Sequence, residues 1–176
     1  MRTDDRIKAS LGGLGYPGFR YLAPTPLEAD PQEVLFEALR ADDMDQRVID
    51  ALPWVLAHRN DLDLRSLTDQ VRSAGIQNRL GFLIEITVSA AKRLRCTQVT
   101  ERLEPFLVVL REVRHPNEDT LAKASMSQVE RRRLHRSRPK AARYWRLLND
   151  LNTNEAGKAI QLGWRGIQAT RMADGS

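Results

Sequence analysis

Residues 76–94, IQNRLGFLIEITVSAAKRL, carry the clearest structural pattern in the chain. The apolar residues of this stretch recur every three or four positions for about five turns, which is the spacing of one face of a helix. Lys92 and Arg93 stand near its end, where cations complement the carbonyl end of a helix. We therefore expect a long helix over 76–94 at the centre of the core. Six residues on this stripe and on the stripes of other helices are expected to be buried: Leu80, Leu83, Ile84, Val88, Leu107 and Trp145.

Gly81 is an unusual residue inside so strong a helical pattern. Glycine in a helix interior costs roughly 1 kcal/mol relative to alanine. A glycine at such a place indicates close approach of a neighbouring element. We expect another helix to pack tightly against Gly81.

Shorter amphipathic helices are expected on both sides of this stretch. Asp30, Asp63 and Ser127 each precede a run with helical spacing and are suited to cap it. Pro53 and Pro105 lie inside two of the expected helices, which they should kink or split. Few aromatic residues and short β-branched runs disfavour a sheet. The prediction is an all-α chain, a single compact multi-helix domain of six to eight helices.

The expected organisation has three parts. Residues 1–30 are rich in glycine and proline and predict an irregular N-terminal arm. Residues 31–170 form the helical domain, whose last helix should end at Gly163, and residues 171–176 form a frayed tail. At 176 residues the chain is long enough for one domain with its own core.

Charge is distributed unevenly along the chain. The net charge is +5, yet residues 31–104 hold ten basic and twelve acidic side chains. Residues 131–146 hold eight Lys or Arg and no carboxylate. Such a cluster is typical of a surface that binds a polyanion, nucleic acid first among them. Seven residues of the cluster are expected to contact nucleic acid: Arg131, Arg132, Arg136, Arg138, Lys140, Arg143 and Arg146.

Two alternative roles for this cluster stay open. The cations could contact an acidic protein, or they could form a solvated face with no partner. The sequence also leaves DNA and RNA undistinguished. A nucleic-acid partner and a protein partner are both expected.

Motifs for catalysis are missing from the sequence. Residues 13–18 match GxGxxG. A dinucleotide site needs a buried strand before the glycines and a helix starting within them. The sequence predicts neither, so we expect no dinucleotide site here. The three histidines have no second histidine or cysteine at ligand spacing, and a single cysteine, Cys96, excludes a disulfide within the chain. We expect no enzyme activity, no cofactor, no metal site and no small-molecule substrate.

The chain also lacks the pattern of a membrane or secreted protein. Its start has no apolar segment of signal-peptide length. The longest apolar stretch, residues 80–91, is interrupted by polar residues and is too short to span a bilayer. We expect a cytoplasmic protein of bacterial type with no membrane partner.

One part of the sequence resembles a known family. Residues 63–67, DLRSL, followed by Asn78 and by residues 79–85, RLGFLIE, are similar to the C-terminal helical region of bacterial AbiEi-type antitoxins and related transcriptional regulators. The resemblance extends over about residues 63–95. It implies a non-catalytic protein that binds its own promoter and counters a nucleotidyltransferase-like toxin.

In that family a winged helix-turn-helix usually precedes the similar region, and residues 1–30 are too short for one. The basic cluster would then supply the nucleic-acid contact. The leading hypothesis is an antitoxin-like regulatory module that binds a protein partner and contacts nucleic acid. The alternatives are a stand-alone nucleic-acid-binding accessory protein and, less favoured, a helical enzyme without a recognised motif.

Overall fold

The computed structural model describes residues 2–23 and 29–173, and their side chains as far as Gly163. Within these residues the chain forms ten helices, eight of them at least seven residues long, and one small parallel sheet. The predicted all-α, single-domain fold is confirmed. The two helices beyond the predicted eight lie at the N-terminus, where no helix was expected.

The elements follow one another along the chain with short connections. In order they are α1 (Thr3–Gly13), the 3₁₀ helix η1 (Pro17–Leu22), α2 (Pro31–Arg40), α3 (Gln46–His58), α4 (Leu64–Ser73), α5 (Gln77–Arg93), α6 (Thr97–Glu112), β1 (Asp119–Thr120), α7 (Gln128–Ser137), α8 (Lys140–Tyr144), β2 (Leu147–Leu148) and α9 (Thr153–Ala173).

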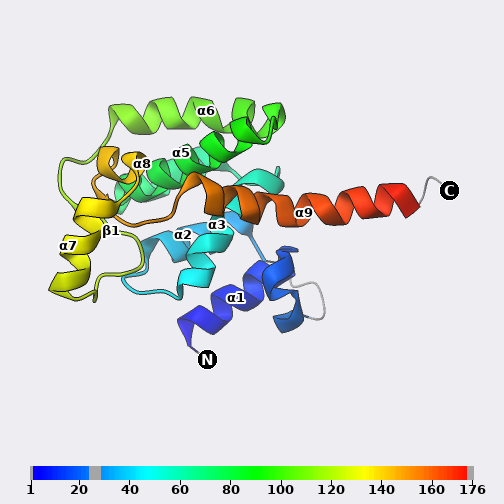
Figure 1. Cartoon of the computed structure of the whole chain (residues 1–176), viewed down its shortest axis with the longest axis horizontal. Helices are drawn as coiled ribbons and strands as arrows, with labels where there is room; N and C mark the ends of the chain where they lie inside the picture. The colour runs from blue at the N-terminus through cyan, green and yellow to red at the C-terminus, as the bar shows by residue number, and fades with distance from the viewer. Residues whose placement is uncertain (1, 24–28, 174–176) are drawn as a thin grey trace.

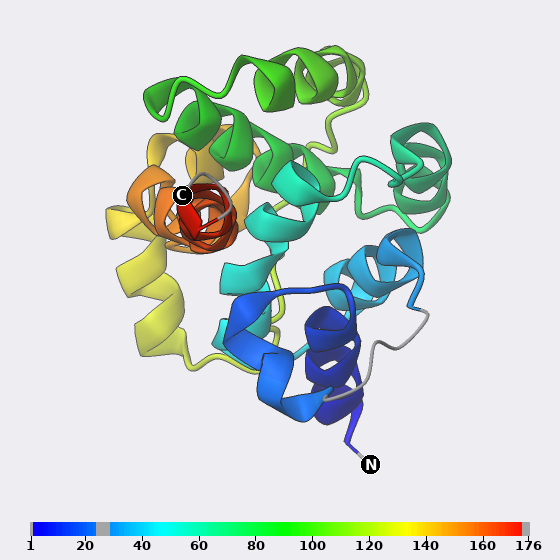
Figure 2. The same cartoon turned by 90° about the vertical axis from the view of Figure 1, so that its right-hand side faces the viewer.

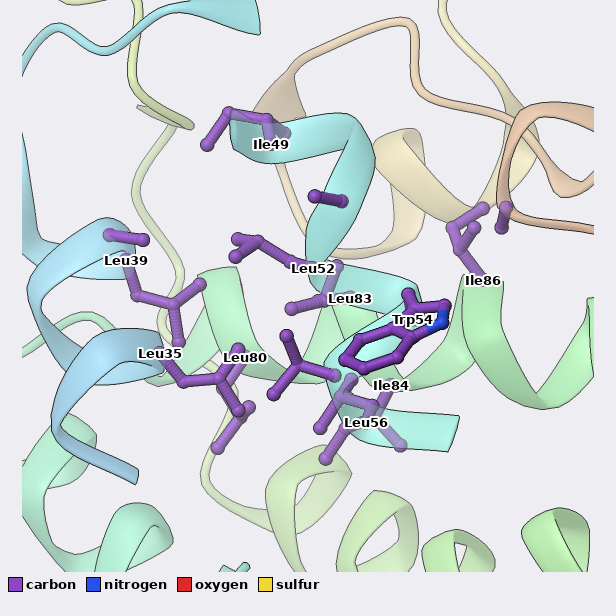
Figure 3. Packing of buried hydrophobic residues seen from close by; sticks show 14 of the residues in the cluster. Leu35, Leu39, Ile49, Leu52, Trp54, Leu56, Leu80, Leu83, Ile84 and Ile86 are labelled. Atoms are coloured by element: carbon purple, nitrogen blue, oxygen red, sulfur yellow. The ribbon is translucent and has the colours of Figure 1, made fainter. Parts of the chain in front are cut away.

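Helix α5 is the centre of the molecule, as its sequence predicted. It packs against α3, α4, α6, α8, α9 and strand β2. Figures 1 and 2 show α6 on one side of the molecule and α1 on the opposite side, with α5 and α3 between them. Figure 3 shows leucine side chains of α2, α3 and α5 meeting in the core. All six residues that were expected to be buried are buried: Leu80, Leu83, Ile84, Val88, Leu107 and Trp145.

The predicted helix starts are confirmed by their caps. The side chains of Asp30, Asp63 and Ser127 each accept a hydrogen bond from a backbone N–H two or three residues further on. Pro53 and Pro105 lie within α3 and α6, and neither splits its helix. Tertiary packing supplies most of the stability of a helix in a protein, so one missing N–H does not end it.

The prediction of an irregular N-terminal arm is wrong. Helices α1 and η1 pack against each other, and α1 packs on α2 and α3. Ile7, Leu11 and Phe19 are buried in the core. Gly12 makes this possible, because a Cβ there would lie 2.3 Å from the backbone oxygen of Phe19. The helical spacing of Ile7, Leu11 and Leu14 was the signal that the glycines obscured.

The prediction that the last helix ends at Gly163 is also wrong, because α9 continues to Ala173. A Cβ at Gly163 would lie 2.7 Å from the His58 ring and 2.8 Å from Trp54 Nε1. This glycine therefore permits close packing on α3 and does not stop the helix. The expected frayed tail overlaps α9 at residues 171–173, and residues 174–176 lie outside the described part of the chain.

The C-terminal part of α9 extends beyond the rest of the molecule (Figure 1). At 21 residues α9 is the longest helix among those described. None of the helices in the described residues is both long and apolar enough to cross a membrane.

Candidate nucleic-acid interface

Trp145 holds the basic part of the chain against α5. Its side chain is fully buried and lies over Gly81, where a Cβ would come within 2.4 Å of the indole ring. Its Nε1–H donates a hydrogen bond to Glu85 Oε2 at 2.9 Å. The close approach predicted at Gly81 is therefore made by a tryptophan side chain, where another helix was expected.

Two buried polar residues at the start of α5 fix the chain beside Trp145. Asn78 Nδ2 donates to the backbone oxygens of His115 and Trp145, both at 2.9 Å, and Asn78 Oδ1 accepts from the His115 N–H at 2.7 Å. Arg79 donates to both carboxylate oxygens of Asp119, from Nε at 2.7 Å and from Nη2 at 3.0 Å. Asn78 and Arg79 thus help to hold the segment after α6, including Trp145, on α5.

Helix α8 is shorter than the sequence predicted. The apolar spacing of Ala141, Tyr144, Trp145 and Leu148 predicts a helix that starts at Pro139, continues to Leu148 and turns these four residues inward. The helix ends at Tyr144, and Leu148 lies in strand β2. The reversal occurs at Arg146, whose φ of 56° lies in the left-handed region. Strand β2 then pairs in parallel with β1, and Asp119 is opposite Leu147.

Five of the seven predicted contact residues are exposed: Arg132, Arg136, Lys140, Arg143 and Arg146. In the part of the chain that the structure describes, none of these five forms an ion pair with a carboxylate. We call these five residues the basic surface. Arg143 Nη2 donates to the backbone oxygen of Arg136 at 3.3 Å, which connects α8 to the end of α7.

Arg138 does not belong to this surface, contrary to the prediction. Only 10% of its side chain is exposed. Its Nη1 donates to the backbone oxygen of Leu147 at 3.0 Å and lies 3.8 Å from the Glu118 carboxylate. The hydrogen bond to the Leu147 backbone oxygen holds this guanidinium inside the fold. Arg138 therefore stabilises the turn between α8 and β2.

Arg131 is intermediate between these two situations. It is half-buried and donates to the backbone oxygen of Ala124 at 2.9 Å. Arg133, which was not among the predicted contacts, is exposed but paired with Glu130 at 2.8 Å. The hydrogen bond between them raises the pKa of Arg133 and lowers the pKa of Glu130. Arg133 is therefore already neutralised within the protein.

A groove of about 560 Å³ runs along α7 and includes part of the basic surface. Arg131, Arg132 and Arg136 line it together with His135, whose Nδ1 lies 3.3 Å from a carboxylate oxygen of Glu118. Three arginine residues thus line one concave surface. Such an arrangement allows several cations to contact one phosphate chain.

The sequence pattern missed two residues at this site, Tyr144 and Arg114. Tyr144 was placed on the inward stripe of α8, but 39% of it is exposed. The Arg114 guanidinium carbon lies 4.2 Å from the centre of the Tyr144 ring, and Nη1 donates to the Tyr144 backbone oxygen at 2.9 Å. No helical period could show this pair, because the chain leaves α8 after one turn.

Among the described residues, no group of three or more His, Cys, Asp or Glu side chains is placed to hold a metal ion. Residues 13–18 extend from the last residue of α1 into the start of η1, so a helix and not a strand precedes the GxGxxG match. No protein-family model, no curated protein and no solved structure matches this chain.

Proposed function

We propose that this protein is a non-catalytic helical module that binds nucleic acid through the basic surface. The observation that supports this most directly is the exposure of five cations on α7, α8 and the turn after α8, none with a carboxylate partner among the described residues. Unpaired clustered cations favour a polyanion, because each phosphate that they neutralise releases condensed counterions.

The basic surface also has a rigid support. Trp145, Asn78 and Arg138 tie its segment to α5 and β2 through buried contacts. The backbone that carries these cations is therefore held in place, which reduces the entropy lost on binding. Four of the five are arginines, whose planar guanidinium groups suit phosphate oxygens. These features favour phosphate over a solvated face with no partner.

A protein partner is the second part of the proposal, as expected for an antitoxin-like regulator. Val108 and Val109 of α6 are 54% and 41% exposed. Val109 and Phe106 line a groove of about 450 Å³ between α6 and α4. Exposed apolar groups beside a groove are typical of protein-binding surfaces. This groove is on different helices from the basic surface, so both could be occupied together.

The nucleic-acid part is tested by the salt dependence of binding. If about four to six phosphates of duplex DNA are engaged, the slope of log affinity against log salt should lie near −4 to −5. Replacing Arg132, Arg136 and Arg143 together by Ala should flatten this slope and weaken binding to all sequences alike. Fluorescence anisotropy at several salt concentrations measures both effects.

A matched control removes the same charge elsewhere. Arg2, Arg20 and Arg40 are exposed and lie at the start of α1, on η1 and at the end of α2. Their combined change to Ala lowers the net charge equally but should leave the slope as it was. If both triple variants bind like the parent, the basic surface does not contact nucleic acid. An acidic protein then becomes the better partner.

The protein-partner part is tested by co-expression with the product of a neighbouring nucleotidyltransferase-like gene. We expect a stoichiometric complex that is lost on Val109→Asp, while nucleic-acid binding is retained. Nucleic-acid binding without such a complex would favour the stand-alone accessory protein.

A further inference from the structure

A pocket of about 390 Å³ lies next to the basic surface, between α5, α8 and the first residue of α9. Its lining combines an aromatic ring, a cation and polar side chains: Tyr144, Lys140, Ser89, Thr153 and Glu85. Lys140 belongs to both the pocket and the basic surface. A ligand in this pocket would therefore be continuous with a nucleic-acid strand bound to the basic surface.

The Tyr144 ring is held in place before any ligand arrives. Arg114 stacks on it at 4.2 Å, and the Trp145 ring meets it edge-on, with the ring centres 5.1 Å apart and the planes at 83°. Trp145 is itself fully buried. Tyr144 is 39% exposed and lines the pocket, and these two contacts leave it little side-chain entropy to lose when a planar group stacks there.

Hydrogen-bonding groups surround this ring. Within the described residues, the hydroxyl groups of Ser89 and Thr153 have no hydrogen-bond partner. The Glu85 carboxylate is paired with Arg111 at 2.9 Å and accepts the Trp145 N–H at 2.9 Å, so its charge is balanced. A carboxylate has about four acceptor positions, and those left over suit the N–H groups of a nucleobase.

We propose that this pocket takes an unstacked base of single-stranded nucleic acid, with Tyr144 as the stacking platform. The adjoining phosphates lie on Lys140 and Arg143. This inference rests on the proposed function and narrows it to one class of ligand. Bases of a duplex are stacked and paired, whereas those of a single strand are free to stack on an aromatic side chain.

The test compares Tyr144→Ala with Tyr144→Phe, which retains the ring. The probes are a fluorescein-labelled single strand of mixed sequence, prepared once as DNA and once as RNA, and the corresponding DNA duplex. Tyr144→Ala should weaken single-strand binding roughly 5- to 150-fold, the effect of one lost base–aromatic stack. Tyr144→Phe should bind like the parent, and duplex binding should be the same in all three proteins. Tyr21→Ala is the matched control, because Tyr21 is 67% exposed on η1.

A second measurement does not rely on a comparison of affinities. Irradiation of the parent with a single strand that carries 5-iodouracil should cross-link the base to the peptide that contains Tyr144. Equal single-strand affinity of Tyr144→Ala and the parent, or cross-links only elsewhere, would overturn the pocket while leaving the basic surface intact. If the parent binds neither the single strands nor the duplex, the proposed function fails and the pocket with it.

Discussion

The inner and outer faces of residues 138–148 use similar side chains for opposite purposes. On the inner face, Arg138 is almost buried and donates to a backbone oxygen, and Trp145 fills the space over Gly81. On the outer face, Lys140 and Arg143 are exposed without a carboxylate partner in the described part of the chain. Whether an arginine is structural or available to a ligand thus depends on how deeply the fold buries its side chain.

The two faces should also differ in energy. Buried aromatic packing and hydrogen bonds to buried carbonyls contribute directly to folding stability. Exposed charges contribute little to stability and remain available to a partner. The comparison therefore predicts large stability effects on the inner face and binding effects with little loss of stability on the outer face.

The largest effect is expected for Trp145→Ala. It removes the fully buried indole and should lower the free energy of unfolding by about 3–5 kcal/mol. Urea denaturation followed by circular dichroism measures this loss. Gly81→Ala should cost about 1–3 kcal/mol in the parent, because its Cβ overlaps the indole. In the Trp145→Ala background the same change should be neutral or stabilising, and equal costs in both backgrounds would contradict the proposed packing.

A smaller effect separates Arg138 from Arg143. Arg138→Met leaves the Leu147 backbone oxygen without its donor and should destabilise by about 1–3 kcal/mol. Arg143→Met should change stability by no more than about 0.5 kcal/mol and should weaken nucleic-acid binding. Paired denaturation and anisotropy measurements check both. The reverse order of the two stabilities would exchange the roles assigned to these arginines.

The smallest effect concerns groups that titrate. His58 stacks on Trp54, its Nε2 lies 2.8 Å from the Ile160 backbone oxygen, and burial lowers its pKa. As pH falls below 6.5, the unfolded chain takes up the proton first, so the free energy of unfolding should decrease. His58→Gln should flatten this dependence, measured by denaturation between about pH 7 and 5. A parent profile that rises on acidification would show the opposite shift.

The exposed pair of Glu130 and Arg133 should affect the free energy of unfolding at a lower pH than His58 does. The hydrogen bond from Arg133 lowers the pKa of Glu130, so its contribution is present above the ordinary value of 4.5 and is lost as pH falls below it. Because both groups are exposed, solvent screens the pair and the change should be smaller than that of His58.

The helical class, the central helix and its buried face could be predicted without a structure. Leu80, Leu83 and Ile84 show this, because a period of 3.6 residues specifies a local conformation and the face that must leave water. Helix caps at Asp30 and Asp63 are equally local. The concentration of cations in residues 131–146 also follows from the sequence alone.

The roles of single residues at close contacts could not be predicted from the sequence. Gly12 and Gly163 were interpreted as breaks, yet each admits a neighbour from another element at less than the distance a Cβ allows. Arg138 and Arg143 are the same residue type in one basic run, but only Arg138 has the Leu147 backbone oxygen within reach. Tyr144 is exposed because α8 ends at this residue. Contacts between distant parts of the chain have no period in the sequence, so these assignments required the packed fold.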